Sequence, residues 1–233
     1  MVKILFVCHG NICRSPTAEY VMKDMVRRAG LEEAFEIASA ATSREELGNP
    51  VYPPARRLLA AHGIDCSDKR ARQLRQDDYD RWDLIIGMDE ENMYHMRRIF
   101  GGDWDGKLHN MMEYAGRPDD PVADPWYTRD FERTWQDISE ACAGLLEELT
   151  GTILIDFSGC QSKGELYGEL RKKMDWESWY GGNLDALYDI LTGFPHKDGR
   201  YAFLMPGAEA PEEVAAYAAR IKAVFAEAGK DVL

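Results

Sequence analysis

The chain has 233 residues, of which 45% are hydrophobic and 30% charged, and its formal net charge is −13 at pH 7. These proportions are typical of a soluble globular protein, and the acidity argues against general nucleic-acid binding, which requires a basic surface. The longest apolar runs have about five or six residues, far fewer than the roughly 18 that cross a bilayer, so no membrane contact is predicted. Five cysteines without a regular spacing indicate free thiols in the reducing cytoplasm. The histidines lack the spacing of metal ligands, so no metal is predicted.

The first 150 residues alternate short apolar segments with amphipathic ones. The segments that predict strands are 2–7, 35–42 and the start of 82–100, and those that predict helices are 15–30, 53–64, the rest of 82–100 and 131–151. Asp89 is placed to cap the helix in the segment 82–100. The alternation indicates an α/β fold with a mostly parallel sheet flanked by helices on both faces. Ligands in such a fold bind beyond the carboxyl ends of the strands, and residues 8–15 follow the first strand.

After Gly151 the alternation starts again, almost without a linker. Strands are predicted at 152–157 and 200–206, and helices at 162–174, 182–193 and 211–229. We therefore predict two domains, 1–150 and 151–233, of which the second is a small α/β domain.

Residues 7–20, VCHGNICRSPTAEY, crowd reactive side chains where the first strand gives way to a helix. A loop at this place can direct several backbone N–H groups at one anion, and a cysteine there loses its proton more easily than a free one. Arg14, which follows Cys8 after five residues, can grip two oxygens of a tetrahedral anion. Gly10 is expected to adopt backbone torsions that a side chain forbids, and Ser15 to donate to the thiolate. The pattern suits a thiolate that attacks phosphorus.

A cysteine five residues before an arginine also occurs by chance, and a buried cysteine is commonly a small apolar side chain. The reaction further needs a proton donor for the leaving group, which Asp124 in VADPWY can supply. An Asp-Pro pair alone usually marks a turn. The functional interpretation therefore depends on the two segments occurring together.

Together the two segments resemble the low-molecular-weight protein tyrosine phosphatases, which have V-C-x-G-N-I-C-R-S near the N-terminus and D-P with two aromatic residues later. The resemblance continues through SAATS, ARRLLAAHGID, RARQL and DLIIGMDEEN and covers about residues 2–149. It implies that Cys8 is the nucleophile of a phosphocysteine intermediate and that Arg14 binds the phosphoryl group. It also implies that Asp124 is the general acid and then the base. No cofactor is implied.

The resemblance also implies roles for the neighbours of these residues. Asn11 and Ser15 would hold the loop and tune the nucleophile, with Ser43 as a partner for Asn11. Cys13 matches a cysteine that can bond reversibly to the nucleophile under oxidation. The residues implied to bind the phosphoryl group and the substrate are His9, Gly10, Asn11, Ile12, Cys13, Trp126 and Tyr127.

Two positions bear on the substrate. Ile12 goes with phosphotyrosine in this family, whereas a branch that acts on phosphoarginine tends to carry threonine there. Glu45 stands where many members have a tryptophan, and its charge is expected to repel acidic phosphopeptides. The expected substrate is a phosphotyrosine protein or an aryl phosphate.

Residues 182–193 place polar side chains on one face of the predicted helix and leucines on the other. Such a face is most often solvated surface. The segments YGGNLDAL and LTG and the order of elements nevertheless resemble barstar, an inhibitor of a basic ribonuclease, over about residues 152–231. The resemblance implies a surface that binds a barnase-like ribonuclease or another basic protein. Its residues would be Trp179, Asp185, Tyr188, Asp189, Thr192, Gly193 and Glu227.

Two functions from different classes follow from these observations. The first is a cysteine-dependent tyrosine phosphatase with an appended protein-binding domain. The second is a ribonuclease inhibitor or other binding protein whose phosphatase half is a degenerate scaffold. The presence of Cys8, Arg14, Ser15 and Asp124 together favours the first, because a scaffold has no need of all four.

Overall fold

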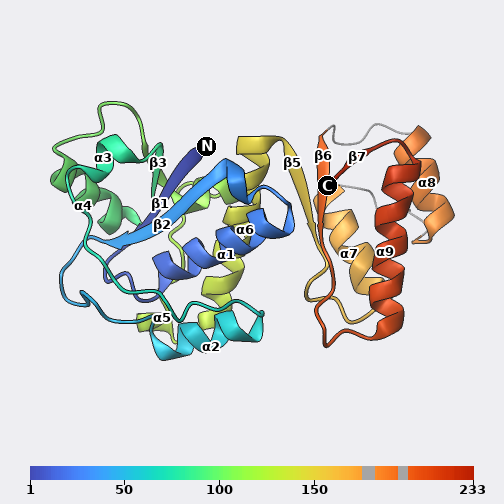
Figure 1. The fold of residues 1–233 in the computed structure, drawn as a ribbon, viewed down its shortest axis with the longest axis horizontal. Helices are drawn as coiled ribbons and strands as arrows, with labels where there is room; N and C mark the ends of the chain where they lie inside the picture. The colour runs from blue at the N-terminus through green and yellow to red at the C-terminus, as the bar shows by residue number, and fades with distance from the viewer. Residues whose placement is uncertain (175–181, 194–198) are drawn as a thin grey trace. The chain divides into compact units, whose positions relative to one another are not determined.

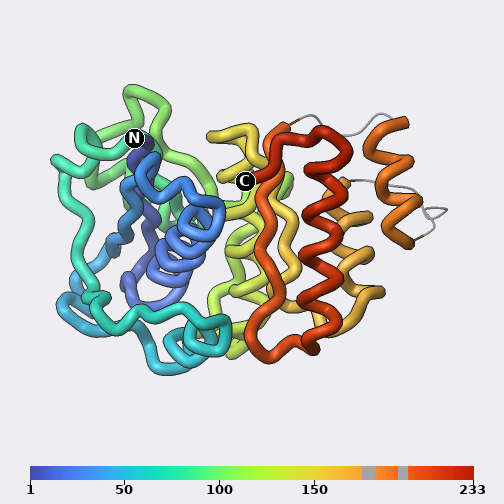
Figure 2. The backbone as a smooth tube through the Cα atoms, turned by 45° about the vertical axis from the view of Figure 1, so that its right-hand side comes forward, coloured from blue at the N-terminus to red at the C-terminus, as the bar shows by residue number. Residues whose placement is uncertain are grey.

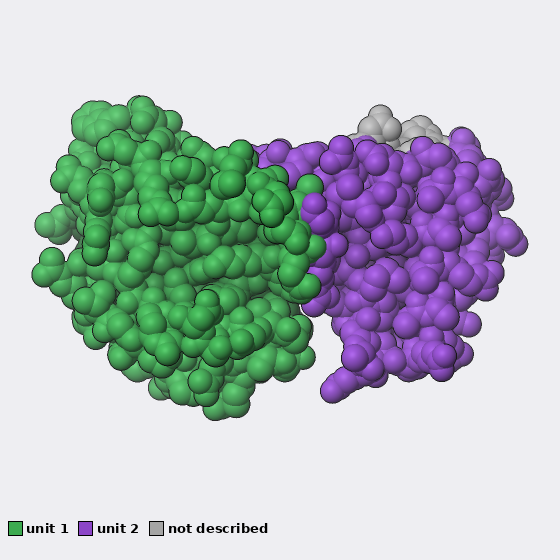
Figure 3. All heavy atoms as spheres, in the orientation of Figure 1, with its two compact units in different colours: residues 1–27, 31–145 green, residues 28–30, 146–233 purple. Residues whose placement is uncertain are grey.

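The structure is a computed structural model that describes residues 1–174, 182–193 and 199–233. The chain divides into two compact units (Figure 3). The N-terminal unit comprises residues 1–27 and 31–145, and the C-terminal unit comprises 28–30 and 146–233. The domain boundary between residues 150 and 151 stays a prediction.

A four-stranded parallel sheet in the order β2-β1-β3-β4 forms the centre of the N-terminal unit (Figure 1). Its strands are β1 (Val2–Cys8), β2 (Phe35–Ala41), β3 (Leu84–Gly87) and β4 (Leu108–Asn110). The helices are α1 (Arg14–Arg28), α2 (Pro53–Ala61), α3 (Asp78–Arg81), α4 (Glu90–Phe100), α5 (Pro125–Thr128) and α6 (Phe131–Thr150), with 3-10 turns η1 (Glu32–Ala34) and η2 (Met111–Ala115).

The sheet is covered on both faces, as the sequence predicts. Four consecutive residues of β1, from Ile4 to Val7, are fully buried, which is typical of a central strand in a parallel sheet. On one face Leu5 and Val7 share a cluster with Met93 and Phe100 of α4. On the other, α1 and α6 lie beside each other, and the thiol of Cys142 on α6 contacts a carbonyl oxygen of α1 (Figure 1).

The strand order indicates where on the sheet a ligand binds. After β1 the chain goes to β2 on one side of it, and after β3 it goes to β4 on the opposite side, so the two connections diverge between the neighbouring strands β1 and β3. A crevice forms at such a point, beyond the carboxyl ends of the strands. Figure 2 shows how β1 runs through a short loop into α1 at this edge. The sequence did not predict β4 or α3, which have three and four residues.

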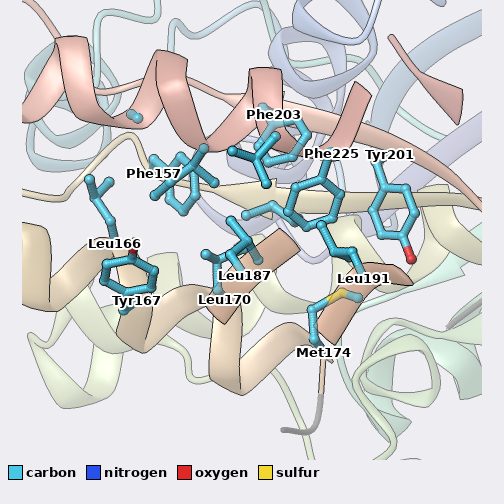
Figure 4. Packing of buried hydrophobic residues seen from close by; sticks show 14 of the residues in the cluster. Phe157, Leu166, Tyr167, Leu170, Met174, Leu187, Leu191, Tyr201, Phe203 and Phe225 are labelled. Atoms are coloured by element: carbon cyan, nitrogen blue, oxygen red, sulfur yellow. The ribbon is translucent and has the colours of Figure 1, made fainter. Parts of the chain in front are cut away.

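The C-terminal unit has its own sheet and core. The parallel strands β5 (Thr152–Asp156), β6 (Arg200–Leu204) and β7 (Asp231–Val232) lie in this order. The helices are α7 (Lys163–Met174), α8 (Leu184–Gly193) and α9 (Glu212–Glu227). Figure 4 shows Phe157, Phe203 and Phe225 gathered with leucines of α7 and α8. The final strand, β7, has two residues. Among the described residues of the chain, no helix is long and apolar enough to cross a membrane.

Candidate active site

The loop between β1 and α1 is fixed by its own sequence and by β2. Asn11 is fully buried and has a φ of 56°, a left-handed conformation that asparagine tolerates better than most residues. The carbonyl oxygens of Cys8 and His9 accept hydrogen bonds from the backbone N–H groups of Thr42 and Ser43. The predicted torsions at Gly10 are wrong, because Gly10 does not have a positive φ and Asn11 makes the turn instead.

Cys8 lies buried at the start of this loop. Its Sγ is 3.0 Å from Ser15 Oγ and 3.3 Å from the backbone nitrogen of Asn11. Asn11 Nδ2 donates to Ser15 Oγ at 2.9 Å, and the Ser15 hydroxyl lies within hydrogen-bond reach of both the sulfur, at 3.0 Å, and the carbonyl oxygen of Ala40, at 3.4 Å. Asn11 Nδ2 also donates to Ser39 Oγ at 2.7 Å, so the predicted partner Ser43 is wrong. Ser39 points inward from β2, whereas Ser43 lies in the loop beyond it.

Arg14 is the first residue of α1, and its guanidinium lies between two carboxylates. Its Nη1 is 2.5 Å from Asp89 Oδ2, and its Nη2 is 2.7 Å from Asp124 Oδ2. Burial alone would lower the pKa of Arg14, but the negative charges of Cys8, Asp124 and Asp89 outweigh it and raise the pKa. The guanidinium is therefore permanently charged and held in one orientation. The sequence predicts Asp89 only as a helix cap and does not indicate this second role.

Asp124 lies at the other wall of the same crevice, immediately before α5. Its Oδ1 accepts a hydrogen bond from the backbone of Trp126 at 2.9 Å, and Pro125 occupies the first helical position. One carboxylate oxygen thus caps a short helix while the other faces Arg14. The ring of Trp126 contacts the ring of Tyr52 edge-on at 6.1 Å between centroids. Tyr127 is 82% exposed.

These residues line one pocket of about 610 Å³. Its walls include every residue predicted for the phosphoryl and substrate site except Asn11 and Ser15, which are buried behind it. Tyr52 lines the pocket together with the predicted aromatic residues Trp126 and Tyr127. No sequence pattern indicated Tyr52, because it is far from both of them in the sequence. Acidic side chains at the mouth include Glu45, Glu46 and Glu91.

Two further predicted residues of the pocket have distinct surroundings. His9 Nε2 lies 3.3 Å from the carboxylate of Glu45; the His9 side chain is about half exposed and that of Glu45 is largely exposed. Cys13 is a free thiol whose pKa is raised by burial and by the negative charges of Cys8 and Asp124. Cys13 is therefore a neutral thiol beside the nucleophile position. Among the described residues, no group of three or more His, Cys, Asp or Glu is arranged to hold a metal ion.

The structure places most of the predicted partner-binding residues on α8. Asp185, Tyr188, Asp189 and Thr192 are exposed, while Leu187 and Leu191 on the opposite side are buried. Gly193 ends the helix and is exposed. Glu227 is exposed at the end of α9. Trp179 lies outside the described residues.

Comparison with known proteins finds two families along the chain. Residues 3–153 match the family model for low molecular weight phosphotyrosine protein phosphatase, and residues 150–232 match the family model for barstar, the barnase inhibitor. The chain is similar to the low molecular weight protein-tyrosine-phosphatase YfkJ of Bacillus subtilis, with 36% identity over 150 residues that cover 64% of this chain and 96% of that protein. It is as similar to low molecular weight phosphotyrosine protein phosphatase 1 of Drosophila melanogaster, with 36% identity over 150 residues that cover 63% of this chain and 96% of that protein.

The fold agrees with these relatives. The crystal structure of YfkJ from Bacillus subtilis matches with a TM-score of 0.62 and 36% sequence identity, covering 64% of this chain and 94% of that chain. The chain therefore belongs to the low molecular weight phosphotyrosine protein phosphatase family and carries a barstar-like C-terminal region.

Proposed function

We propose that the N-terminal unit hydrolyses phosphotyrosine through a phosphocysteine intermediate. Family membership makes the chain a protein-tyrosine phosphatase, and the proposal concerns the residues that perform the reaction. The observation that carries it is the position of Arg14. Arg14 is the first residue of the helix that follows the Cys8 loop, and its guanidinium lies 2.7 Å from Asp124 Oδ2. A nucleophile, an anion-binding group and a proton donor therefore meet in one pocket.

In the first step, Cys8 Sγ attacks phosphorus and the bond from phosphorus to the phenolic oxygen breaks. Arg14 and the backbone N–H groups of the loop hold the three equatorial phosphoryl oxygens. The protonated carboxyl of Asp124 gives its proton to the departing phenolic oxygen as the bond breaks.

In the second step, a water molecule attacks phosphorus and Asp124 accepts a proton from it. The bond from phosphorus to sulfur breaks, and phosphate and the thiolate of Cys8 are formed. The thiolate is stabilised by Ser15 Oγ at 3.0 Å and by the backbone N–H of Asn11 at 3.3 Å. The same two contacts make Cys8 both a nucleophile and a leaving group.

The test is release of p-nitrophenol from p-nitrophenyl phosphate in EDTA by the wild type and by Cys8→Ser. We expect the variant to lose activity to the uncatalysed background, because an alcohol is a far weaker nucleophile than a thiolate. Cys66→Ala is the matched control, since Cys66 is a buried thiol that does not line the pocket. An inactive, fully reduced wild type would contradict the proposal and favour the degenerate scaffold.

The substrate class follows from the walls of the pocket. Ile12 and the aromatic residues Tyr52, Trp126 and Tyr127 present apolar surface that suits a phenyl ring. We expect a phosphotyrosine peptide to be hydrolysed with a higher kcat/KM than the matching phosphoarginine peptide. If Ile12→Thr prefers the phosphoarginine peptide, Ile12 is the residue that discriminates between the two substrates. If Ile12→Thr still prefers the phosphotyrosine peptide, other residues discriminate.

For the C-terminal unit we propose binding of a basic protein, such as a barnase-like ribonuclease. The match to barstar and the exposed carboxylates of Asp185 and Asp189 support this proposal. Carboxylates on a rigid helix can occupy a basic cleft that binds RNA phosphates.

Titration calorimetry of the whole chain with a basic ribonuclease tests this second proposal. Binding is expected to weaken with added salt and with Asp189→Ala. Glu33→Gln, which removes one exposed negative charge from the N-terminal unit, is expected to bind like the wild type. Equal binding by Asp189→Ala would show that this face of α8 is not the contact surface.

A further inference from the structure

The residue immediately before Asp124 is held at both of its backbone polar groups by α6. The N–H of Ala123 donates to Asp137 Oδ2 at 3.2 Å, and its carbonyl oxygen accepts from Thr134 Oγ1 at 2.8 Å. Thr134 and Asp137 are three residues apart and therefore lie on one face of the helix. Both are almost fully buried, with 3% and 2% exposure. The backbone of Ala123 thus cannot rotate without breaking a buried hydrogen bond.

The carboxylate of Asp137 also forms ion pairs with two arginines. Arg117 Nη2 lies 3.1 Å from Asp137 Oδ1, and Arg133 Nε lies 3.1 Å from the same oxygen. A buried carboxylate needs such partners, because an unpaired charge inside a protein is strongly destabilising. Arg117 is the first residue and Ala123 the last residue of the segment 117–123. The Asp137 carboxylate binds the side chain of Arg117 and the backbone N–H of Ala123, so it ties both ends of this segment to α6.

The segment is fastened from the sheet side as well. The N–H of Val122 donates to the carbonyl oxygen of Met88 at 2.9 Å, and Val122 is 1% exposed. Met88 precedes Asp89, which holds Arg14. The chain just before Asp124 is therefore fixed between the end of β3 and α6, and the direction of the Asp124 carboxyl follows from this backbone.

We propose that Asp137 and Thr134 are positioning residues that keep the carboxyl of Asp124 aimed at the leaving group. The inference rests on the proposed function, in which Asp124 is the general acid. A general acid acts only within hydrogen-bond reach of its target, and a shift of about 1 Å can cost about 100-fold in rate. Neither Asp137 nor Thr134 lines the pocket, so both act through Ala123.

The test measures kcat/KM for aryl phosphates whose phenols differ in acidity. A poor leaving group such as phenol needs its proton, whereas dinitrophenol departs without one. For phenyl phosphate we expect Asp137→Ala to lower kcat/KM about 10-fold or more, and for dinitrophenyl phosphate about 2-fold or less. Asp124→Ala is expected to show the same dependence on the leaving group with a larger amplitude.

Two further variants separate positioning from stability. Thr134→Val keeps the shape of the side chain and removes its hydroxyl, so it is expected to fold and to lose activity selectively with phenyl phosphate. Thr134→Ser restores the hydroxyl and is expected to recover the activity. Glu140→Gln is the matched control, because Glu140 contacts Arg117 at 2.7 Å from the same helix and has no bond to Ala123.

The outcomes distinguish this inference from the proposed function. If Asp124→Ala is selective for poor leaving groups while Asp137→Ala and Thr134→Val lose the same factor with every substrate, the positioning role is wrong and the proposed function stands. Full activity of Thr134→Val with phenyl phosphate would equally overturn the positioning role. If Asp124→Ala itself shows no selectivity, the assignment of the general acid fails first.

Discussion

Arg14 and Asp89 are 75 residues apart in the sequence and form a hydrogen-bonded ion pair of 2.5 Å at the carboxyl edge of the sheet. The two oxygens of Asp89 have different tasks. Oδ1 accepts from the backbone N–H of Asn92 at 2.7 Å and so caps α4, whereas Oδ2 accepts from Arg14 Nη1. The helix cap therefore also sets the direction of the guanidinium.

This division of tasks predicts different effects for two substitutions of Asp89. Asn is as good a helix cap as Asp, so Asp89→Asn is expected to keep the stability of the protein. Its kcat/KM for p-nitrophenyl phosphate is expected to fall about 10-fold, because the amide nitrogen that replaces Oδ2 cannot accept from Arg14, and the charge-assisted bond that orients the guanidinium, worth about 1 to 2 kcal/mol, is lost. Steady-state kinetics and thermal unfolding measure the two quantities.

Asp89→Ala removes both contacts and serves as the comparison. It is expected to lose the same activity and, in addition, about 1 kcal/mol of stability from the lost cap. Wild-type kinetics in Asp89→Asn would show that Arg14 is oriented without Asp89. A loss of stability in Asp89→Asn equal to that of Asp89→Ala would contradict the separation of the two roles.

Asp78 makes the N-terminal unit sensitive to acid. Burial alone would raise its pKa, but hydrogen bonds from Arg72, from the backbone of Arg75 and from Trp82 outweigh burial and lower it. A carboxyl whose pKa is lowered by folding stabilises the protein above its unfolded pKa of about 3.9. This stability is lost as the pH falls through the lower, folded pKa.

We therefore expect Asp78→Asn to lower the free energy of opening of the N-terminal unit by about 1 to 3 kcal/mol at neutral pH and to flatten its acid dependence. Hydrogen exchange of peptides from β1 and β3 reports this unit separately from the other. Asp77→Asn is the control, because Asp77 is an exposed neighbour whose side chain does not cap α3. An unchanged acid dependence in Asp78→Asn would assign the sensitivity to other carboxyls.

The sequence predicts those parts of the site that lie within one local pattern. The spacing of Cys8, Arg14 and Ser15 belongs to a single strand, loop and helix, so it can be read without knowledge of the fold. The pairing of Ser15 with Cys8 is present at 3.0 Å. Asp124 is distant in sequence and could be connected to this loop only through the resemblance to a family.

The contacts that were missed depend on the packing of separate elements. Asp89 already had an explanation as a helix cap, so nothing in the sequence indicated its bond to Arg14. Asp137 looks like a solvated charge on an amphipathic helix, but α6 turns it inward, where it is 2% exposed. The choice between Ser39 and Ser43 for Asn11 depends on where β2 ends, because Ser39 points inward from the strand and Ser43 lies in the loop beyond it. The strand β4 has three residues, too few to show an alternating pattern.

Glu45 at the mouth of the pocket is expected to select substrates by charge. We predict that Glu45→Gln raises kcat/KM for a phosphotyrosine peptide with acidic neighbours about 2-fold to 3-fold relative to one with basic neighbours. The effect is small because the Glu45 side chain is 74% exposed, and it should shrink with added salt. Competition between the two peptides in one reaction measures the ratio directly.

Glu33→Gln is the control for this experiment, because Glu33 is exposed in η1 and does not line the pocket. It is expected to leave the ratio unchanged. An equal change in both variants would point to the net charge of the protein as the cause. No change in Glu45→Gln would mean that the peptide neighbours lie elsewhere.

Cys13 is expected to protect Cys8 against irreversible oxidation. Because burial and neighbouring negative charges raise its pKa, Cys13 stays a neutral thiol and peroxide reacts first with Cys8. Peroxide converts the thiolate of Cys8 to a sulfenic acid, and Cys13 then displaces water from it to form a disulfide. After peroxide treatment, dithiothreitol should restore most of the wild-type activity and much less of that of Cys13→Ser, whose sulfenic acid proceeds to the sulfinic acid. Mass spectrometry of the oxidised wild type should find the two cysteines linked, and Cys66→Ala should recover like the wild type because Cys66 does not line the pocket. Equal recovery of Cys13→Ser would show that Cys13 has no protective role.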